Sequence, residues 1–361
     1  MQFYSADKIF TGEEWLTNHV IAVNNNVVEA IVPLSSINEK IKYFDNCFIA
    51  PAFIDLQIYG AGGKLLAVFP EKDSLIKLVD YCRAGGAAHC MPTVATHPYD
   101  TFYKSIDAIK DYWNGGGEGV LGLHIEGPWI STEKRGAHIA EFIHTPTLKQ
   151  VKELLEYGKG VIKIITLAPE VCSKEIIDCI LSYDIVISAG HSNANYEQAT
   201  NAFNNGISAA THLYNAMSPL QHRSPGMVGA IMDHSSVMSS IIPDGYHANF
   251  AAVRIAKQVM KERLFAITDA VTETSSGSYP HQLAGDKYES GGILSGSALT
   301  MAKAVKNLVQ SCDIELGEAL RMCGLYPASV MGLENRLGMI KKDHEAALVV
   351  MDKEFNVITL L

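Results

Sequence analysis

Short, nearly continuous apolar runs alternate with helix-like stretches through the middle of the chain, and this alternation limits the possible folds most strongly. The runs lie at 48–54, 119–123, 161–165, 185–188, 239–242 and 264–267. Residues 148–157, 195–205 and 253–261 instead have the apolar spacing of a helix. Strands that are apolar on both faces and alternate with helices predict a parallel sheet covered by helices. Eight such units over about 280 residues would close into a (β/α)8 barrel.

Strand-like segments also occupy both ends of the chain. Residues 19–23 and 27–32 are apolar and flank three consecutive asparagines, a typical hairpin-turn signal. Residues 346–351 and 357–361 repeat this arrangement around a polar turn near the C-terminus. Because both ends are β-rich around a different middle, we expect them to assemble into one small sheet module.

Charge, cysteine content and the N-terminal residues narrow the class of protein. The 361 residues include 29 Lys and Arg against 39 Asp and Glu, a formal charge of −10, which argues against nucleic acid or an anionic membrane as a partner. The N-terminus has no apolar stretch typical of a signal peptide, and no run approaches the roughly 18 apolar residues that span a bilayer. The seven cysteines are odd in number and form no Cys-x-x-Cys pair. We therefore expect a cytoplasmic protein with reduced, mostly buried thiols.

Titratable side chains directly follow several strand-like segments. They are Glu126, His191, His212, Asp244 with His247, and Asp269. In a barrel the carboxyl ends of the strands meet on one face, where catalytic groups gather. One carboxylate and two imidazoles, here Glu126, His191 and His212, form a familiar zinc-binding set that leaves a position open for water. A nearby aspartate such as Asp269 can then carry the proton of that water.

Each of these residues also has an ordinary structural interpretation. A single histidine among thirteen is more often a surface or core residue than a ligand, and Asp269 taken alone fits a helix N-cap. We interpret His124, in the same strand as Glu126, as structural. Six further histidines are assigned to ordinary positions: His19, His97, His222, His234, His281 and His344. Five strand ends that all finish in titratable groups nevertheless favour a site.

Three further segments suggest contacts to a ligand. Asn215 supplies an amide side chain just after His212, beside free backbone N–H groups. Arg223 carries a guanidinium suited to a phosphate, although taken alone it fits an ordinary surface arginine. Residues 291–297 form a small-residue loop that we expect to open a helix, where backbone donors can approach a sugar or an anion.

Taken together, the motifs resemble the amidohydrolase superfamily and, within it, the N-acetylglucosamine-6-phosphate deacetylases. The matching segments run in order along nearly the whole chain: 51–57, 122–128, 136–138, 190–194, 211–217, 244–247, 268–270 and 294–297. The most specific of them are Glu126-Gly127-Pro128 and the stretch from His212 to Met217. The resemblance implies a (β/α)8 catalytic barrel over 51–336 and a small β-sandwich domain built from residues 1–50 and 337–361.

By this resemblance, the expected reaction is hydrolysis of the acetamide of N-acetyl-D-glucosamine 6-phosphate to D-glucosamine 6-phosphate and acetate. The implied metal ligands are Glu126, His191 and His212, and the implied catalytic acid/base is Asp269. The implied phosphate and sugar contacts are Asn215, the Ala216 backbone and Arg223. The other implied substrate-binding positions are Ala137, His138, His247, Leu294, Ser295 and Gly296. The family also implies a homodimer and one divalent ion per subunit, most often zinc.

The chain departs from the superfamily pattern after the first barrel strand. Many amidohydrolases have His-x-His there, whereas this chain has Gln57 and Tyr59, so we expect a single metal ion. Tyr59 and residues 271–274 also differ from the deacetylase pattern at positions that could line the sugar site. Two alternatives therefore stay open. One is a deacetylase of N-acetylgalactosamine 6-phosphate or another acylated amino sugar phosphate, and the other is a non-catalytic barrel that binds a phosphosugar.

Overall fold

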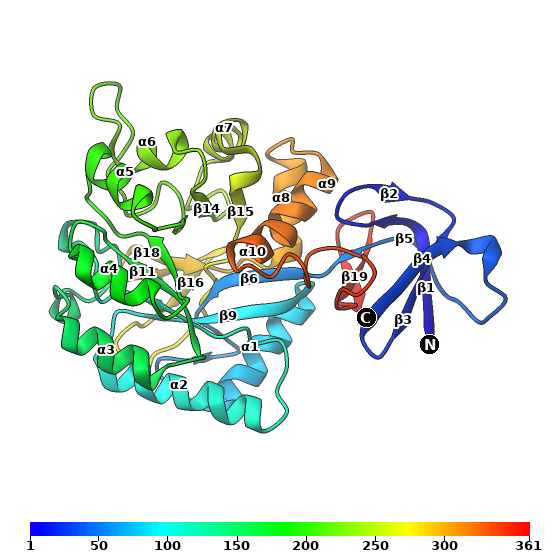
Figure 1. Ribbon diagram of the computed structural model, residues 1–361, viewed down its shortest axis with the longest axis horizontal. Helices are drawn as coiled ribbons and strands as arrows, with labels where there is room; N and C mark the ends of the chain where they lie inside the picture. The colour runs from blue at the N-terminus through cyan, green and yellow to red at the C-terminus, as the bar shows by residue number, and fades with distance from the viewer.

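Eight parallel strands in the middle of the chain form the barrel that the sequence predicts (Figure 1). The computed structural model describes residues 1–361. The barrel strands are β6 (Phe53–Ile58), β9 (Ala87–Ala95), β10 (Leu123–Glu126), β11 (Ile162–Leu167), β12 (Val186–Ala189), β13 (Ala209–Ala210), β14 (Met238–Ile241) and β15 (Leu264–Ala266). Neighbouring strands pair in sequence order from β6 to β15. The ring closes where Ile58, at the end of β6, pairs with Ala270 just beyond β15.

Ten α-helices connect and cover the barrel strands. They are α1 (Lys72–Ala84), α2 (Tyr99–Asn114), α3 (Leu148–Tyr157), α4 (Lys174–Leu181), α5 (Tyr196–Asn204), α6 (Gly226–Asp233), α7 (Phe250–Met260), α8 (Met301–Gln310), α9 (Leu316–Cys323) and α10 (Leu325–Val330). Short 3-10 turns lie at η1 (Leu34–Ser36), η2 (Thr132–Lys134), η3 (Ala140–Phe142) and η4 (Lys261–Arg263). Side-chain capping fixes where several helices begin: Thr147 and Gln150 form a capping box at α3, and Asn195 and Gln198 form one at α5.

The two ends of the chain form a second sheet at one side of the barrel, where both termini lie (Figure 1). Its strands are β1 (Gln2–Phe10), β2 (Trp15–Leu16), β3 (His19–Asn24), β4 (Val27–Pro33), β5 (Lys42–Pro51), β19 (Leu348–Asp352) and β20 (Val357–Leu360). The C-terminal strand β19 pairs with β5, so both ends of the chain contribute to one sheet, as expected. The sheet curls back on itself, because Val27 also pairs with Glu345 just before β19. It therefore encloses a small hydrophobic core separate from that of the barrel.

Residues 291–297 do not open a helix, so that expectation is wrong. Ile293–Ser297 form β18, which pairs with β17 (Lys287–Ser290) and through it with β16 (Gln282–Ala284) in an antiparallel sheet. A Cβ at Gly296 would lie 2.6 Å from Val271, so the small residue lets this strand lie close to the barrel rather than begin a helix. Helix α8 begins only at Met301, capped by Thr300. A further hairpin, β7 (Gly60–Ala61) with β8 (Lys64–Leu65), follows β6.

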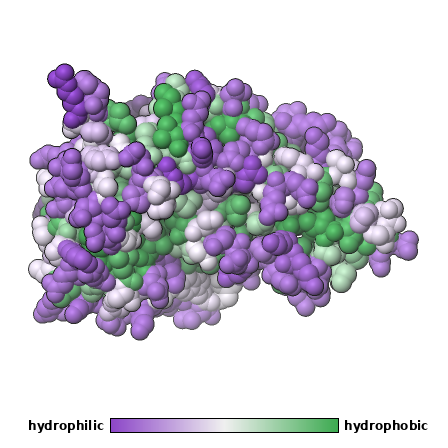
Figure 2. All heavy atoms as spheres, turned by 45° about the horizontal axis from the view of Figure 1, so that its top comes forward, coloured by the Kyte–Doolittle hydropathy of each residue, from purple (hydrophilic) through white to green (hydrophobic).

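All seven cysteines are free and five of them are buried, as predicted. The face drawn in Figure 2 is largely hydrophilic, with apolar side chains scattered between the polar ones. None of the ten helices combines the length and the apolar character that crossing a membrane requires.

Replacing Ile54 by alanine is expected to lower the free energy of unfolding by about 2–5 kcal/mol. Ile54 lies in β6 and is fully buried in the barrel core, so the change leaves a cavity that close packing cannot fill. The measurement is the urea midpoint of wild-type and variant protein. Ile76→Ala on α1 is the matched control, because Ile76 is 40% exposed, and it is expected to change stability by less than about 0.5 kcal/mol. Equal effects of the two changes would contradict the assignment of β6 to the core.

Candidate active site

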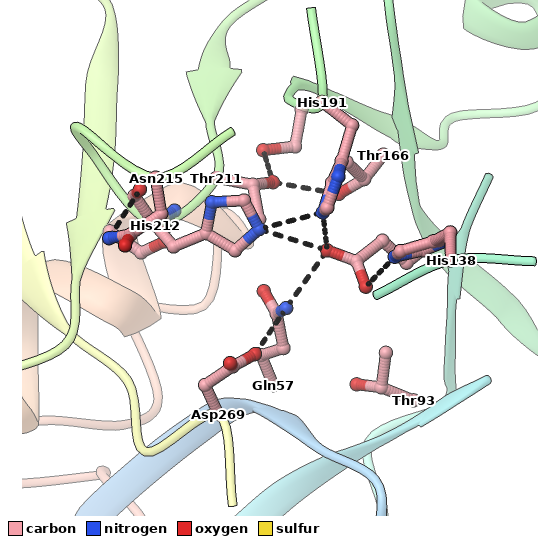
Figure 3. Close-up of polar contacts among 12 residues, drawn as sticks. Gln57, Thr93, His138, Thr166, His191, Thr211, His212, Asn215 and Asp269 are labelled. Carbon is pink, nitrogen blue, oxygen red and sulfur yellow. Dashed lines mark hydrogen bonds and ion pairs between the residues drawn. The ribbon is translucent and has the colours of Figure 1, made fainter. Parts of the chain in front are cut away.

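Four titratable side chains from different strands meet at the carboxyl end of the barrel, and Figure 3 labels three of them, His191, His212 and Asp269. Glu126 is the last residue of β10, while His191, His212 and Asp269 follow β12, β13 and β15 closely. All four are buried. His191, His212 and Asp269 have left-handed backbone conformations, with φ of 48°, 36° and 54°. Such conformations are costly for non-glycine residues and cluster at functional sites, and here each one turns the chain as it leaves its strand.

Glu126, His191 and His212 bring three potential metal ligands to one point (Figure 3). Their ligand atoms all lie within 4.8 Å of one another. Oε1 of Glu126 is 3.1 Å from Nε2 of His212 and 3.3 Å from Nε2 of His191, and the two Nε2 atoms are 3.1 Å apart. A carboxylate and two imidazoles at these distances can hold one divalent ion and leave room for a water or a substrate oxygen.

The protonation of His191 fits this role. Its Nδ1 lies 3.0 Å from the carbonyl oxygen of Lys134, which can only accept a hydrogen bond. The proton of the neutral ring is therefore on Nδ1, so Nε2 presents a lone pair toward Glu126 and His212. An outer hydrogen bond of this kind is typical of metal-bound histidines. His212 lacks the corresponding contact, because its Nδ1 is enclosed without a hydrogen-bond partner.

Gln57 and Tyr59, at the positions of the missing His-x-His pair, make hydrogen bonds to the same group. The Gln57 side-chain amide donates to Oε1 of Glu126 at 3.1 Å and to Oδ1 of Asp269 at 2.7 Å. The Tyr59 hydroxyl donates to Oε2 of Glu126. Burial alone would raise the pKa of Glu126, but the surrounding histidines hold it well below its usual value. Glu126 is therefore an anion whose two oxygens are already oriented.

Asp269 lies beside the metal-ligand group and faces His247. Burial raises the pKa of Asp269 above its usual value, although the charges of His212 and His247 oppose the shift. Nε2 of His247 is 3.9 Å from Oδ2 of Asp269, and its Nδ1 is 2.6 Å from Oδ2 of Asp244. Burial would raise the pKa of Asp244, but its hydrogen bonds with His247 hold it below its usual value. Asp244 thus fixes the His247 ring with Nε2 toward Asp269.

His138 reaches the opposite side of Glu126 from a loop after β10. Its Nε2 is 3.2 Å from Oε2 of Glu126, and its Nδ1 is 2.7 Å from the Thr96 hydroxyl and accepts from the Thr96 amide at 3.4 Å. Burial lowers the pKa of His138 to about 4, so the ring is neutral at pH 7. Because Nδ1 accepts, the proton lies on Nε2, where it can be donated to an oxygen beside Glu126.

His124 lies deeper in the barrel and is held as a structural residue, as we interpreted it. Its Nδ1 is 3.1 Å from the carbonyl oxygen of Leu56 and its Nε2 is 2.7 Å from the Thr166 hydroxyl. Burial lowers its pKa to about 4. The Thr166 hydroxyl also forms a hydrogen bond of 2.7 Å with the hydroxyl of Thr211, the residue just before His212. This chain of contacts ties β6, β11 and β13 together beneath the candidate metal site.

One cavity, which we call the main cavity, contains the metal-ligand group and Asp269. Its volume is about 640 Å³ with the open mouth included. The residues that line it are Tyr59, Glu126, Gly136, Ala137, His138, His191, His212, Asn215, Ala216, His247, Asp269, Leu294, Ser295 and Gly296. All but one of the predicted metal-binding, catalytic and substrate-binding residues therefore share a single cavity. The exception is Arg223, which is exposed on the loop before α6 and does not line it.

Two histidines that the sequence analysis assigned to ordinary positions lie next to this site. His97 and His281 are buried and line a smaller cavity, the side chamber, which shares Tyr59, Glu126 and His138 with the main cavity. A signal for His97 existed, since it follows β9 by two residues, but β9 was not among the recognised apolar runs. His281 reaches the chamber from a loop before β16, and no motif in the sequence marks it.

Comparison with known proteins places this geometry in a family. A model of the amidohydrolase family matches residues 48–361, which include the whole barrel and every predicted site residue. The chain belongs to the amidohydrolase family. A second model, described as the NagA composite domain, matches residues 7–46 within the terminal sheet.

Several relatives match this amidohydrolase over almost its full length. An N-acetylglucosamine-6-phosphate deacetylase of Haemophilus influenzae is 33% identical, with 97% of this chain and 95% of that protein covered. An N-acetylgalactosamine-6-phosphate deacetylase of Escherichia coli O157:H7 is 30% identical, with 98% and 95% covered. The crystal structure of N-acetylglucosamine-6-phosphate deacetylase from Pasteurella multocida superposes with a TM-score of 0.94 at 32% identity, covering 100% of this chain and 97% of that one. The fold of this amidohydrolase therefore matches that of the deacetylases throughout.

Replacing Tyr59 by phenylalanine is expected to weaken binding of a divalent ion about 10- to 100-fold, the usual cost of removing a group that orients a metal ligand. The variant loses only the hydroxyl that donates to Glu126. The affinity for zinc is measured by isothermal titration calorimetry. Tyr43→Phe in the terminal sheet is the control, because the Tyr43 hydroxyl bonds to Asp7 far from the site. Unchanged zinc affinity in Tyr59→Phe would show that this hydrogen bond does not orient Glu126 for a metal.

Proposed function

We propose that this amidohydrolase removes the acetyl group of N-acetyl-D-glucosamine 6-phosphate and releases D-glucosamine 6-phosphate and acetate. The observation that carries the proposal is the buried group of Glu126, His191 and His212 beside Asp269, in a chain related along its length to deacetylases of this substrate. The N-acetylgalactosamine isomer is not favoured, although two relatives, at 30% and 32% identity, are named for it. A barrel without catalysis would have no use for an aspartate kept beside the metal-ligand group.

Glu126, His191 and His212 would hold the divalent ion. When bound there, the ion supplies a Lewis acid for the amide carbonyl and lowers the pKa of a water molecule. We propose zinc, because two imidazoles and one carboxylate are a typical zinc-binding set. The Gln57 amide and the Tyr59 hydroxyl keep the Glu126 oxygens oriented, and they take the place of the histidines that would bind a second ion.

Asp269 would move the proton that the reaction requires. As a carboxylate, Asp269 accepts a proton from the attacking water at Oδ2, the oxygen that faces His247. It then returns this proton to the amine nitrogen as the C–N bond breaks. The Gln57 amide, which donates to Oδ1, leaves Oδ2 free for this exchange. The raised pKa of Asp269 suits both steps, because a group that accepts and then releases a proton works best with a pKa close to the ambient pH.

The neutral His138 would donate a hydrogen bond from its Nε2–H to the carbonyl oxygen of the substrate as negative charge develops there. The remaining cavity residues would bind the sugar. Asn215, the Ala216 backbone and His247 line the main cavity but not the side chamber, and Leu294, Ser295 and Gly296 of β18 provide further contacts. These assignments explain why polar groups converge in a cavity that opens at the carboxyl end of the barrel.

Arg223 would bind the phosphate of the substrate from the neighbouring subunit of a homodimer. Within one chain Arg223 is exposed outside the main cavity, which contains no lysine or arginine of its own. A phosphate needs cationic partners, and a second copy of the chain can supply one. We propose the homodimer, and with it a cytoplasmic location, as part of the same function.

Arg223→Ala is expected to raise KM for N-acetyl-D-glucosamine 6-phosphate about 10- to 100-fold, since hydrogen bonds to a charged group contribute about 1.5–3 kcal/mol. Turnover of the unphosphorylated sugar should not change, because it lacks the group that Arg223 binds. Steady-state kinetics on both sugars measure the two effects. Lys149→Ala on α3 removes an exposed cation elsewhere and serves as the control. An unchanged preference for the phosphorylated sugar in Arg223→Ala would exclude the phosphate role.

The choice between the two sugar isomers is tested by kcat/KM for N-acetyl-D-glucosamine 6-phosphate and N-acetyl-D-galactosamine 6-phosphate with one zinc-loaded preparation. The proposal predicts a higher value for the glucosamine compound. A higher value for the galactosamine compound would transfer the assignment to that isomer and leave the hydrolytic chemistry in place.

A further inference from the structure

Asp55 is a buried carboxyl group that the proposed reaction does not use. It lies in β6, two residues before Gln57, and only 1% of its surface is exposed. It lines neither the main cavity nor the side chamber, so it does not meet the proposed substrate directly. Its side-chain partners include no lysine, arginine or histidine. Because burying a carboxylate without a cation is costly, its presence here requires contacts that depend on it.

Three hydrogen-bond donors surround the Asp55 carboxyl group. Oδ1 accepts from the backbone N–H of Thr268 at 3.1 Å and from that of Gln57 at 3.3 Å. Oδ2 accepts from the Thr268 hydroxyl at 2.5 Å. Burial raises the pKa of Asp55 to about 7, while these hydrogen bonds favour the carboxylate and oppose the shift. The three donors therefore stabilise the charge in place of a cation.

The Thr268 hydroxyl links Asp55 to the turn that carries Asp269. Besides donating to Asp55, this hydroxyl accepts a hydrogen bond from the backbone N–H of Ala270 at 3.2 Å. Its single proton goes to Asp55, because the carbonyl oxygen of Gln57 is farther away, at 3.4 Å. Thr268 and Ala270 stand directly before and after Asp269, so one hydroxyl bridges the two sides of this residue.

The turn needs such a bridge because Asp269 has a left-handed backbone conformation, with φ of 54°. This conformation costs a non-glycine residue on the order of 1–3 kcal/mol and persists only where the surrounding contacts hold it. Relaxation to a negative φ would rotate the side chain away from the Gln57 amide, which donates to Oδ1 of Asp269 at 2.7 Å (Figure 3). The bridge therefore fixes the direction in which the Asp269 carboxylate points.

Asp55 also holds the other partner of this contact. Its Oδ1 accepts from the backbone of Gln57 and from that of Thr268, so one oxygen atom joins the two chain segments below the cavity. Further along the same side of the barrel, the Gln57 amide reaches Asp269 and Glu126. The position of Gln57 relative to Asp269 is therefore set by one carboxylate.

Closure of the barrel does not depend on Asp55. At the seam between β6 and β15, the Asp269 N–H donates to the Gln57 carbonyl oxygen at 2.9 Å. The Tyr59 N–H donates to the Ala270 carbonyl oxygen, also at 2.9 Å. These main-chain hydrogen bonds pair the two strand ends without any side chain. What Asp55 adds is a fixed orientation for the turn between them.

We propose that Asp55 is a positioning residue that acts through Thr268 and keeps the Asp269 carboxylate directed at the attacking water and the amine nitrogen. This inference rests on the proposed deacetylase function, in which Oδ2 of Asp269 accepts a proton from the water and later returns it to the nitrogen. Both transfers require a directed oxygen, and a displacement of about 1 Å can cost about 100-fold in rate. Asp55 itself exchanges no proton with the substrate.

The first test replaces Thr268 by valine and by serine. Valine has the shape of threonine without the hydroxyl and breaks the bridge, whereas serine retains the hydroxyl. We expect kcat for acetate release to fall at least about 10-fold in Thr268→Val with KM within about two-fold, and Thr268→Ser to stay within about three-fold of the wild-type kcat. Counting kcat per bound zinc removes the effect of any unfolded protein. The assay pH is about one unit above the pKa of Asp55, where the carboxylate predominates.

Thr11→Val is the matched control, because it removes a buried hydroxyl that accepts from the Glu14 N–H beside the terminal sheet. It should leave kcat unchanged. Wild-type kcat in Thr268→Val, or a Thr268→Ser protein as slow as Thr268→Val, would overturn the proposal. Absence of acetate release from the zinc-loaded wild-type protein would instead reject the proposed function, on which the inference rests.

Asp55→Asn tests whether the effect of Thr268 passes through Asp55. Asparagine has the size of aspartate but a single acceptor oxygen, so it cannot accept from the backbone N–H groups and from the Thr268 hydroxyl together. We expect kcat to fall at least about 10-fold, and the double variant Asp55→Asn/Thr268→Val to stay within about three-fold of the slower single variant, because both changes break the same link. Effects that multiply in the double variant would show that the two residues act independently, which would overturn the proposal.

Discussion

Asp269→Asn is expected to lower kcat for acetate release by about 10²- to 10⁴-fold, the contribution that general acid–base catalysis usually makes. An amide has the size of the carboxylate but cannot take a proton from water or return it to the amine nitrogen. Metal binding should persist, because Asp269 is not one of the three converging ligands. The measurements are kcat and zinc content, the latter by elemental analysis of the same preparation.

Asp100→Asn on α2 is the matched control for this change, because the Asp100 side chain is 74% exposed and lines neither the main cavity nor the side chamber. It should retain wild-type turnover. Asp269→Asn with full activity would remove Asp269 from the mechanism. Asp269→Asn without zinc would show that Asp269 acts as a ligand and that the separation of roles is wrong.

Glu126→Gln is expected to release the divalent ion and lower activity at least about 100-fold, since it replaces the anionic ligand by a neutral amide in a buried site. The substituted side chain also keeps only one acceptor oxygen, so it can accept a hydrogen bond from Gln57 or from Tyr59 but not from both. The measurements are zinc stoichiometry and the increase in Tm on adding zinc, which reports binding without reference to turnover.

Treatment of the wild-type protein with a chelator should reproduce this loss, and zinc should restore activity to the wild-type protein but not to Glu126→Gln. Glu153→Gln on α3 is the control, because the Glu153 side chain is 57% exposed. A Glu126→Gln protein that keeps one zinc ion and its turnover would show that the metal lies elsewhere. A wild-type protein whose Tm does not respond to zinc would contradict the three-ligand site independently of any assay.

The barrel could be predicted because most of its strands are buried on both faces and therefore appear as apolar runs. β6 is buried along its whole length, and β11 is nearly so. β9 escaped recognition because His89, Pro92 and Thr93 interrupt its apolar pattern. β13 has only two residues, and the sequence marks it only by the short strand-like segment that precedes His212.

The convergence of Glu126, His191, His212 and Asp269 was predictable for a topological reason. Parallel strands in a barrel bring their carboxyl ends to one face, so residues far apart in the sequence meet if each follows a strand. The contacts that tune these groups could not be predicted in the same way. The Lys134 carbonyl beside His191 comes from a loop whose path no strand pattern specifies.

Residues outside the strand ends show where the sequence carries too little information. The segment 291–297 looked like the start of a helix because it is rich in glycine and serine, but antiparallel pairing with β17 determines its conformation. The exposure of Arg223 depends on the path of the loop before α6. His281 reaches the side chamber only because the β16–β18 sheet folds over the barrel mouth.

The central claim is tested most directly by measuring acetate release by zinc-loaded protein. The two substrates, N-acetyl-D-glucosamine 6-phosphate and unphosphorylated N-acetyl-D-glucosamine, are compared under identical conditions. We expect rapid release from the phosphorylated sugar, loss of that release on chelation, and much slower release from the free sugar. Equal, slow cleavage of both sugars would contradict the phosphate site. Absence of release from the phosphorylated sugar by protein shown to contain zinc would contradict the proposed reaction.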